Sequence, residues 1–164
     1  MALDMFIHFG GGKIKGESKD AKMAAKGAVD ILAWSWGLSQ SGTFGSGGGG
    51  GAGKASFQDL SFTHHIDKAS TALQLHCATG THIDDATITV RKAGEKQENY
   101  LVITMSPVLV TSVSTGGSGG EDRLTENVSL NYGKVKVEYW AQDKAGELKS
   151  AGEFHYDIQT NQKV

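Results

Sequence analysis

A long glycine-rich stretch lies between two segments that have the alternating pattern of β-strands, and this arrangement limits the possible folds more than any other feature. The first segment, residues 31–37, reads ILAWSWG, and the second, residues 55–62, reads ASFQDLSF. Between them runs SQSGTFGSGGGGGAGK. Side chains of a strand alternate between two faces, so the pattern predicts strand, loop, strand. Long connections in a compact domain usually have a function, and we therefore expect an extended functional loop at residues 40–54.

The same stretch comes close to a phosphate-binding motif. Residues 48–55 read GGGGAGKA, one residue short of G-x-x-x-x-G-K-[ST], in which backbone N–H groups hold phosphates and the lysine contacts the terminal phosphate. Ala55 offers no hydroxyl to Mg²⁺, and the pattern after Lys54 predicts a strand where the motif needs the N-terminus of a helix. We therefore expect a flexible connection here, with no nucleotide and no cofactor.

Length and composition favour one domain with one hydrophobic core. The chain has 164 residues, and its 16 basic and 18 acidic side chains are interspersed, so no basic patch indicates a nucleic-acid partner. Cys77 is the single cysteine, which excludes an internal disulfide and points to folding in a reducing cytoplasm. The sequence shows neither a signal-peptide pattern nor the run of ~18 apolar residues that a membrane span needs.

Period-two alternation recurs along the chain and predicts about seven strands. They fall at residues 3–9, 29–37, 55–65, 86–91, 100–113, 127–140 and 154–158. In the sixth strand the apolar positions change from even to odd numbers near Gly133, which predicts an extra residue, a β-bulge, at that point. Pro107 suggests a further bulge or a sheet edge in the fifth strand. The fold class is therefore mainly β, an antiparallel barrel or sandwich.

One segment changes to a helical period. Its apolar side chains recur at spacings of three and four, at Ile66, Ala69, Leu73 and Cys77. Asp67 or Ser70 can cap its start, and Gly80 follows its last turn, so we expect one flanking helix from Asp67 to Thr79. For residues 13–26 the sequence does not decide between a loop and a short helix, because AKMAAK favours a helix but no clear cap precedes it.

The strand at residues 29–37 has one bulky and one small face. Asp30, Leu32, Trp34 and Trp36 share the first face, and we expect the two tryptophans to anchor the core. The opposite face, with Ile31, Ala33 and Ser35, should then be turned away from the core of the subunit.

Two further patterns suggest chemistry, but their context argues against it. Residues 116–120, GGSGG, satisfy the nucleophile elbow G-x-S-x-G, yet the residues after Ser118 have a β pattern where a hydrolase needs a helix. Four histidines lie near Cys77 in the sequence, at positions 64, 65, 76 and 82. Neighbours on a strand point to opposite faces, and neighbours on a helix lie about 100° apart, so these side chains should not converge on a metal. We expect solvated or capping histidines, no metal site and no catalytic residue.

Several stretches together resemble the Hcp family, the hemolysin-coregulated tube proteins of bacterial type VI secretion. They are AWSWGLSQSGT, the glycine run with GAGK, FQDLSFT, DKAS, TVRKAG and the run from Tyr100 to Tyr139. The resemblance covers nearly the whole chain and departs from the family around residues 9–30 and at the pair His64–His65. It implies a β-barrel subunit with one flanking helix, which forms hexameric rings that stack into a tube inside a contractile sheath.

The resemblance also implies partners, a location and sites. The tube is expelled with a spike from a baseplate, carries effectors, and leaves the bacterial cytoplasm without a signal peptide, with no nucleic acid bound and no membrane insertion. Ring stacking is expected to use loop residues Ser41, Gly42, Thr43, Phe44, Ser46, Gly49 and Lys54, and the lumen is expected to receive Ile31, Ala33 and Ser35. The alternatives are a monomeric hydrolase built on Ser118, a nucleotide binder built on Lys54, and a carbohydrate-binding barrel with Trp34 and Trp36 exposed.

Overall fold

The structure, a computed structural model, describes residues 2–45, 51, 53–94 and 96–164. Its strands are β1 (Leu3–Phe9), β2 (Val29–Ser35), β3 (Leu38–Ser39), β4 (Ser56–Phe57), β5 (Leu60–His65), β6 (Ala86–Lys92), β7 (Asn99–Gly116), β8 (Thr125–Gln142), β9 (Leu148–Asp157) and β10 (Gln162–Lys163). Its helices are α1 (Lys68–Thr79) and a single 3₁₀ turn, η1 (Ala24–Lys26). Six of the predicted strands correspond to β1, β2, β6, β7, β8 and β9, although β9 begins well before the predicted residues 154–158. The single strand predicted at residues 55–65 is divided instead into β4, which pairs with β3 in a separate sheet, and β5 of the barrel. The short strands β3 and β10 were not predicted.

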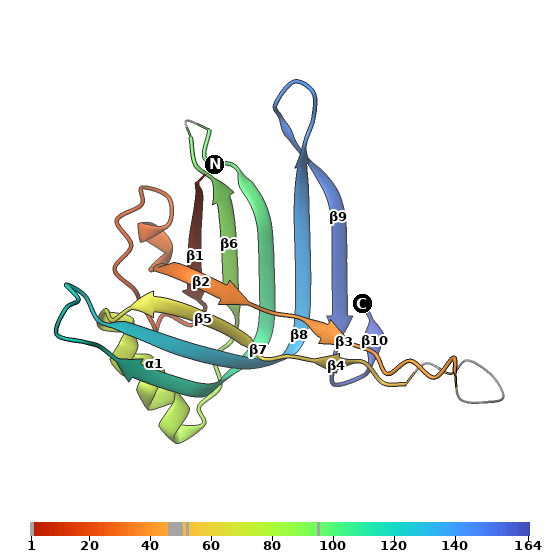
Figure 1. The fold of residues 1–164 in the computed structure, drawn as a ribbon, viewed down its shortest axis with the longest axis horizontal. Coiled ribbons are helices and arrows are strands. Elements are labelled where there is room, and N and C mark those ends of the chain that lie inside the picture. Colours follow the sequence, from red (N-terminus) through yellow and green to blue (C-terminus); the bar gives the residue numbers. More distant parts are fainter. Residues whose placement is uncertain (1, 46–50, 52, 95) are drawn as a thin grey trace.

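The strands close into an antiparallel barrel (Figure 1). The order β8-β5-β2-β1-β6-β7 returns to β8 through the pairing of β7 with β8, while β9 and β10 extend the sheet beyond β8. The interior is filled by apolar side chains from these strands and by Ala69 and Leu73 of α1, which packs against β7. The predicted class, a mainly β fold with one flanking helix, is confirmed.

The strands β7 and β8 bend together where they pass from one side of the barrel to the other (Figure 1). In β8 the buried positions change from even to odd numbers between Tyr132 and Val135, and in β7 they change from odd to even between Met105 and Val108. The predicted change of face near Gly133 is therefore confirmed.

Its predicted cause is wrong. The pairing keeps its register through the bend, with Ser106 opposite Lys134 and Val108 opposite Tyr132, so neither strand has an extra residue there. The register between β7 and β8 shifts further along instead, between Val110 and Ser112. The bulge that was one alternative at Pro107 is likewise absent from the described pairing of β7 with β8. The other alternative, a sheet edge, agrees with the pairing of β7 with β6, which ends at Met105.

A bulge in β2 was not apparent from the sequence. The pairing of β2 with β5 shifts between Ile31 and Ala33, and an inserted residue changes the face to which the following side chains point. Ile31 is buried in the core and Leu32 is 48% exposed, so both of these side chains lie on the side opposite to the one predicted. Ala33 and Ser35 are exposed, as expected, and Trp34 packs partly against the core.

The helix α1 begins and ends where the sequence places it. The Asp67 carboxylate accepts the N–H of Ala69 at 2.8 Å, and the Ser70 hydroxyl accepts the N–H of Asp67 at 3.1 Å, which together form a capping box. Gly80 ends the helix with a φ of 67°, in the left-handed region that glycine adopts without strain. The undecided segment at residues 13–26 is irregular apart from the single turn η1.

Candidate assembly surfaces

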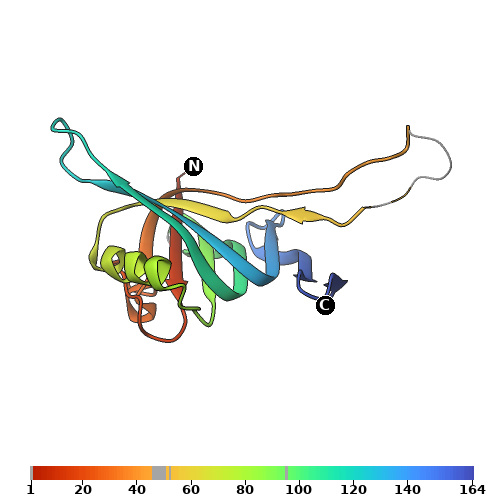
Figure 2. The same cartoon turned by 90° about the horizontal axis from the view of Figure 1, so that it is seen from below.

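Residues 38–45 and, of the returning chain, residues 51 and 53–57 belong to an arm that projects from one end of the molecule. Figure 2 shows the chain leaving the barrel after β2 and returning to β5, while the hairpin between β7 and β8 projects from the opposite end. Near the barrel the two halves of the arm pair as β3 and β4, where Leu38 lies opposite Phe57 and Ser39 opposite Ser56. The predicted contact residues Ser46 and Gly49 lie outside the described residues.

The described outer part of the arm is exposed. The Phe44 side chain is 94% exposed, and Ser41, Gly42 and Lys54 are exposed as well. The Thr43 hydroxyl donates to the carbonyl oxygen of Gly51 at 2.7 Å and accepts the N–H of Gly51 at 3.2 Å, so it bridges the two halves of the arm. The Phe44 ring is therefore exposed to solvent on a segment whose two halves are hydrogen-bonded to each other and which lies away from the barrel.

A second surface consists of small uncharged side chains on the outside of the barrel. Residues that lie opposite each other in paired strands point to the same face of the sheet. Across β2, β5, β8 and β7 the pairing forms two neighbouring rows of this kind, with one residue from each strand in each row. The rows are Ser35, Ser61, Ser129 and Ser112, and then Ala33, Thr63, Asn127 and Ser114. We call these eight residues the serine face.

Hydrogen bonds connect the serine face across its strands. The hydroxyls of Ser61 and Ser129 lie 3.1 Å apart, and the Thr63 hydroxyl donates to the Asn127 side-chain oxygen at 2.6 Å. All eight residues are exposed or half-buried, so the face is accessible in the isolated subunit. Sequence analysis found only its edge, Ala33 and Ser35, because the other members come from three strands whose register the sequence does not reveal. The available signal was the alternation of Ser, Thr and Asn with apolar residues in β5 and β8.

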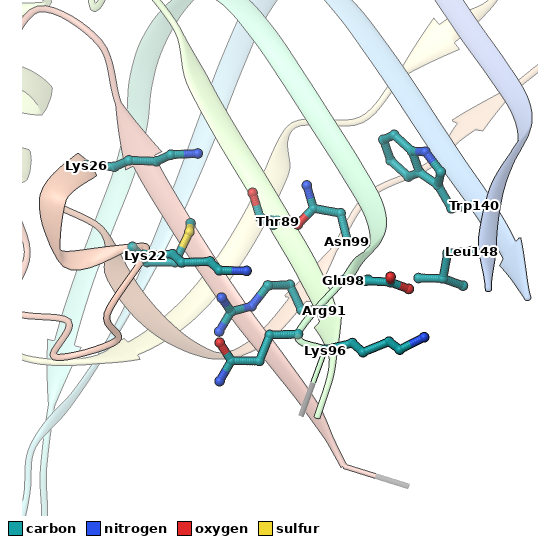
Figure 3. A pocket seen from close by; sticks show the side chains of 11 residues that line it. Lys22, Lys26, Thr89, Arg91, Lys96, Glu98, Asn99, Trp140 and Leu148 are labelled. Atoms are coloured by element: carbon teal, nitrogen blue, oxygen red, sulfur yellow. The ribbon is translucent and has the colours of Figure 1, made fainter. Parts of the chain in front are cut away.

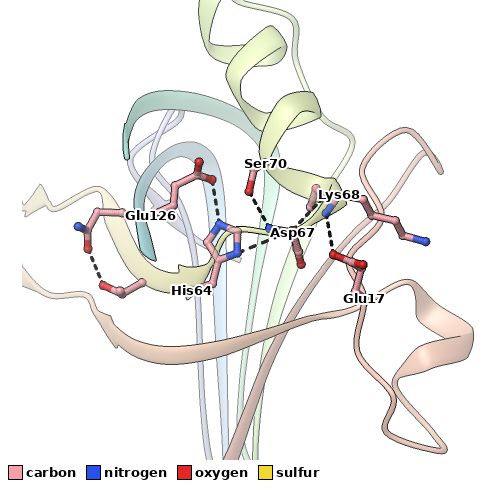
Figure 4. Close-up of polar contacts among 9 residues, drawn as sticks. Glu17, His64, Asp67, Lys68, Ser70 and Glu126 are labelled. Carbon is pink, nitrogen blue, oxygen red and sulfur yellow. Dashed lines mark hydrogen bonds and ion pairs between the residues drawn. The ribbon is translucent and has the colours of Figure 1, made fainter. Parts of the chain in front are cut away.

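A buried, hydrogen-bonded pair of titratable side chains lies beneath the start of α1 (Figure 4). The Nε2 atom of His64 lies 2.9 Å from Oε1 of Glu126, both side chains are fully buried, and the Asp67 carboxylate lies 3.9 Å from the other ring nitrogen of His64. Burial raises the pKa of the Asp67 carboxyl. The expectation of a solvated or capping His64 is wrong, because this strand residue points into the barrel.

The other histidines do not form a metal site either. His76 is also buried, and its Nδ1 atom lies 2.7 Å from the carbonyl oxygen of Ala72 one turn earlier in α1, which again contradicts a solvated side chain. His65 is half-buried and His82 exposed. Among the residues that the structure describes, no three His, Cys, Asp or Glu side chains converge as metal ligands.

A second buried charge, Arg91, ties the segment before β2 to the barrel. Its guanidinium nitrogens lie 3.2 and 2.6 Å from the two carboxylate oxygens of Asp20, and its guanidinium carbon lies 4.7 Å from the centre of the Phe6 ring. The hydrogen bond from Arg91 holds the pKa of the Asp20 carboxyl at about 2, below its usual 3.8. Such a bidentate pair has a fixed geometry, so it positions the irregular segment against β1 and β6.

A pocket of about 460 Å³ opens beside Arg91 (Figure 3). Lysine side chains at 22, 26 and 96 lie around it, together with Glu98, Trp140 and Leu148. Arg91 is already paired with Asp20, and no nucleophile with an adjacent base lines this pocket, so it lacks the arrangement of a catalytic site.

The three alternative functions lack the geometry that each would need. Ser118 is exposed in the turn before β8, so the strand-to-helix elbow of a hydrolase is not formed. Lys54 is followed by β4 rather than by a helix, so no helix N-terminus faces a phosphate there. Trp34 and Trp36 are half-buried against the core rather than displayed for a sugar.

Comparison with known proteins identifies the family. A family model described as "Type VI secretion system effector, Hcp" matches residues 6–139. The chain belongs to the Hcp family. It is 55% identical over 165 residues to the protein hcp1 of Pseudomonas aeruginosa, a match that covers 100% of this chain and 99% of that protein.

Solved Hcp structures have the same fold. Hcp1 from Salmonella typhimurium is 36% identical, with a TM-score of 0.78 over 100% of both chains. A structure described as a type six secretion system protein is 28% identical, with a TM-score of 0.91 over 99% of this chain and 100% of that one. The resemblance seen in the sequence is thus confirmed, and the chain is an Hcp-family protein of type VI secretion. In the part of the chain that the structure describes, no helix has the length and hydropathy to cross a bilayer.

Proposed function

We propose that this Hcp-family protein is the structural subunit of a secretion tube, in which hexameric rings of identical copies stack and the arm contacts the next ring. The observation that supports this most strongly is the exposure of Phe44 at 94% on an arm that projects beyond the barrel. Aromatic side chains are enriched at protein–protein interfaces, and this ring stands on a segment that projects far enough to contact another copy. An arm at one end contacting a different surface of the next copy is a heterologous contact, which produces open, repeating assemblies.

The serine face is a suitable wall for the lumen of such a tube. Its hydroxyl and amide groups hydrogen-bond to water, and its side chains are short, so cargo passing over them meets neither a large apolar patch nor a charge. We place Ala33 and Ser35 there, with the effector cargo in contact. Ile31, which belongs to the core, is no longer part of this proposal.

The remaining parts of the proposal concern partners, location and chemistry. The tube works with a contractile sheath, a baseplate and a spike, and it passes from the bacterial cytoplasm to the exterior or a target cell without a signal peptide. No enzymatic step, nucleic acid or membrane insertion is required of it. The absence of an elbow at Ser118 and of a helix after Lys54 supports the structural role.

Replacing Phe44 by Asp tests the role of the arm. A carboxylate at this position resists burial against another ring, so the variant should form hexamers but neither tubes nor secreted protein. Ring mass is measured by size-exclusion chromatography with light scattering, stacking by negative-stain microscopy, and export by immunoblot of the culture medium. Shortening the chain at residues 47–51 should have the same effect.

The matched control is Leu75→Asp, which places the same charge at an exposed apolar position, 61% exposed, on α1. We expect this variant to form rings and tubes. Normal tubes from Phe44→Asp would show that the arm is not the stacking element. Dissociation of its hexamers would place the arm in the contact between subunits of one ring.

A further inference from the structure

The arm leaves and rejoins the barrel at residues 36–37 and 57–59, which we call the root, and one buried hydroxyl group contacts both passages of the chain there. The indole N–H of Trp36 donates to the hydroxyl oxygen of Tyr132 on β8, and that hydroxyl donates to the carbonyl oxygen of Gln58 at 2.7 Å. Trp36 lies where the chain departs and Gln58 where it returns, and the N–H of Gln58 also donates to the carbonyl oxygen of Gly37 at 2.9 Å. One side chain of the barrel therefore fixes both passages of the chain.

The environment of Tyr132 keeps this hydroxyl available as a donor. The side chain is 5% exposed, and burial raises the pKa of its phenol above the usual value of 10. The group is therefore protonated at physiological pH. Hydrogen bonds shielded from water in this way also have better-defined geometry than bonds at an exposed surface.

Two further contacts hold the root from either side of Tyr132. The Asp59 carboxylate accepts the hydroxyl of Thr111 at 2.7 Å and the amide of Asn131 at 2.9 Å, which ties it to β7 and β8. The ring of Phe57 stacks on that of Tyr156 of β9, with centroids 5.3 Å apart and planes at 26°.

Beyond the root, the described part of the arm is held to itself rather than to the barrel, by the two pairs between β3 and β4 and by the bonds between Thr43 and Gly51. A two-stranded ribbon of this kind is marginally stable in water when it stands alone. The eight steps along the chain from Trp36 to Phe44 can span at most about 28 Å, so a tilt of about 10° at the root would move Phe44 by up to about 5 Å. A displacement of that size exceeds the tolerance of a packed contact, because a gap of only about 0.5–1 Å already removes about a quarter to a half of the attraction between packed atoms.

We propose that Tyr132 is a positioning residue: its hydroxyl sets the direction in which the arm leaves the barrel, and through that direction it decides whether rings stack, without taking part in ring formation. This inference rests on the proposed contact between the arm and the next ring. The partner surface is on a second copy of the same chain.

The variant Tyr132→Phe removes only the hydroxyl and keeps the ring in the core. The Trp36 indole loses its acceptor and the Gln58 carbonyl loses its donor, so the root should open more often. In hydrogen exchange of intact rings, we expect the amide of Gln58 to exchange at least tenfold faster while α1 is unchanged. We expect hexamers of normal mass, and secretion and stacking reduced at least tenfold. Trp36→Phe, which removes the indole donor, should reproduce part of the effect.

Thr79→Val is the matched control, because it removes a hydroxyl that donates to a backbone carbonyl oxygen, that of Leu75 at 2.9 Å, at the end of α1 and outside both proposed surfaces. It should change neither exchange at the root nor stacking. The inference is overturned if Tyr132→Phe stacks and is secreted like the parent protein, if its rings dissociate, or if α1 exchanges faster to the same extent. The two possible failures give different results. If the arm does not join rings at all, rings of both Tyr132→Phe and Phe44→Asp stack normally. If only the role of Tyr132 is wrong, rings of Tyr132→Phe stack normally and rings of Phe44→Asp do not.

Discussion

His64 and Glu126 form a fully buried, hydrogen-bonded pair in a molecule whose proposed assembly surfaces lie elsewhere. Each side chain supplies the other with a hydrogen-bond partner that water would otherwise provide, because a buried polar group without a partner is costly. The sequence correctly predicts that His64 and His65 point to opposite faces of a strand. It could not show that the inner one meets Glu126, since that contact requires β5 to pair with β8 in a particular register.

Removing one member of this pair should be costly. His64→Ala leaves the Glu126 side chain buried without its hydrogen-bond partner, so we expect the free energy of unfolding to fall by about 1–3 kcal/mol from the unsatisfied group alone. Urea denaturation at fixed protein concentration measures this loss. His65→Ala, on the outward side of the same strand, is the control and should cost much less. An equal loss in both variants would show that the buried pair has no special role.

The pair Arg91–Asp20 predicts a dependence on pH. Because the pKa of Asp20 in the folded protein is about 2 and its usual value is 3.8, the carboxylate contributes stability above about pH 4 that is lost as the pH falls toward 2. The melting temperature of Asp20→Asn should therefore lie below that of the parent protein at pH 6. The difference between the two should shrink between pH 4 and pH 2. A constant difference over this range would contradict the assignment.

At the scale of helices and strands, the sequence predicts the features that depend on residues close together in the chain. The capping box and Gly80 define both ends of α1, and alternation locates the seven longer strands. The bulge between Ile31 and Ala33 was missed because it appears only when β2 is paired with β5. The shared bend at Gly133 was located but misattributed for the same reason, since one strand alone cannot show that its partner turns with it.

The candidate surfaces also differ in whether their residues are close together in the sequence. The arm could be located from the sequence because its glycines and the flanking alternation are contiguous in the chain. The serine face could not, because its rows join residues as far apart as Ser35 and Ser129, and only the register of four strands brings them together. The root at Tyr132 was missed for the same reason.

At the scale of the whole molecule, the serine face gives a test of the lumen. Ser35→Gln places a longer side chain on this face without adding a charge, so we expect rings and tubes to persist while the stability or export of effector cargo falls several-fold. Co-purification of cargo and immunoblots of the culture medium measure this effect. Lys68→Gln, at an exposed position on α1 outside the face, is the control. Loss of rings in Ser35→Gln would place this residue in a contact between subunits.

The arm has one further consequence, which concerns length. It projects from one end of the molecule, so in the proposed stack a copy that receives an arm still offers its own to the copy beyond (Figure 2). An assembly joined in this way has no internal stop, since each addition recreates the surface that the previous addition used. The chain therefore contains no measure of how long a tube should be. That dimension would have to come from a separate component that caps or terminates growth.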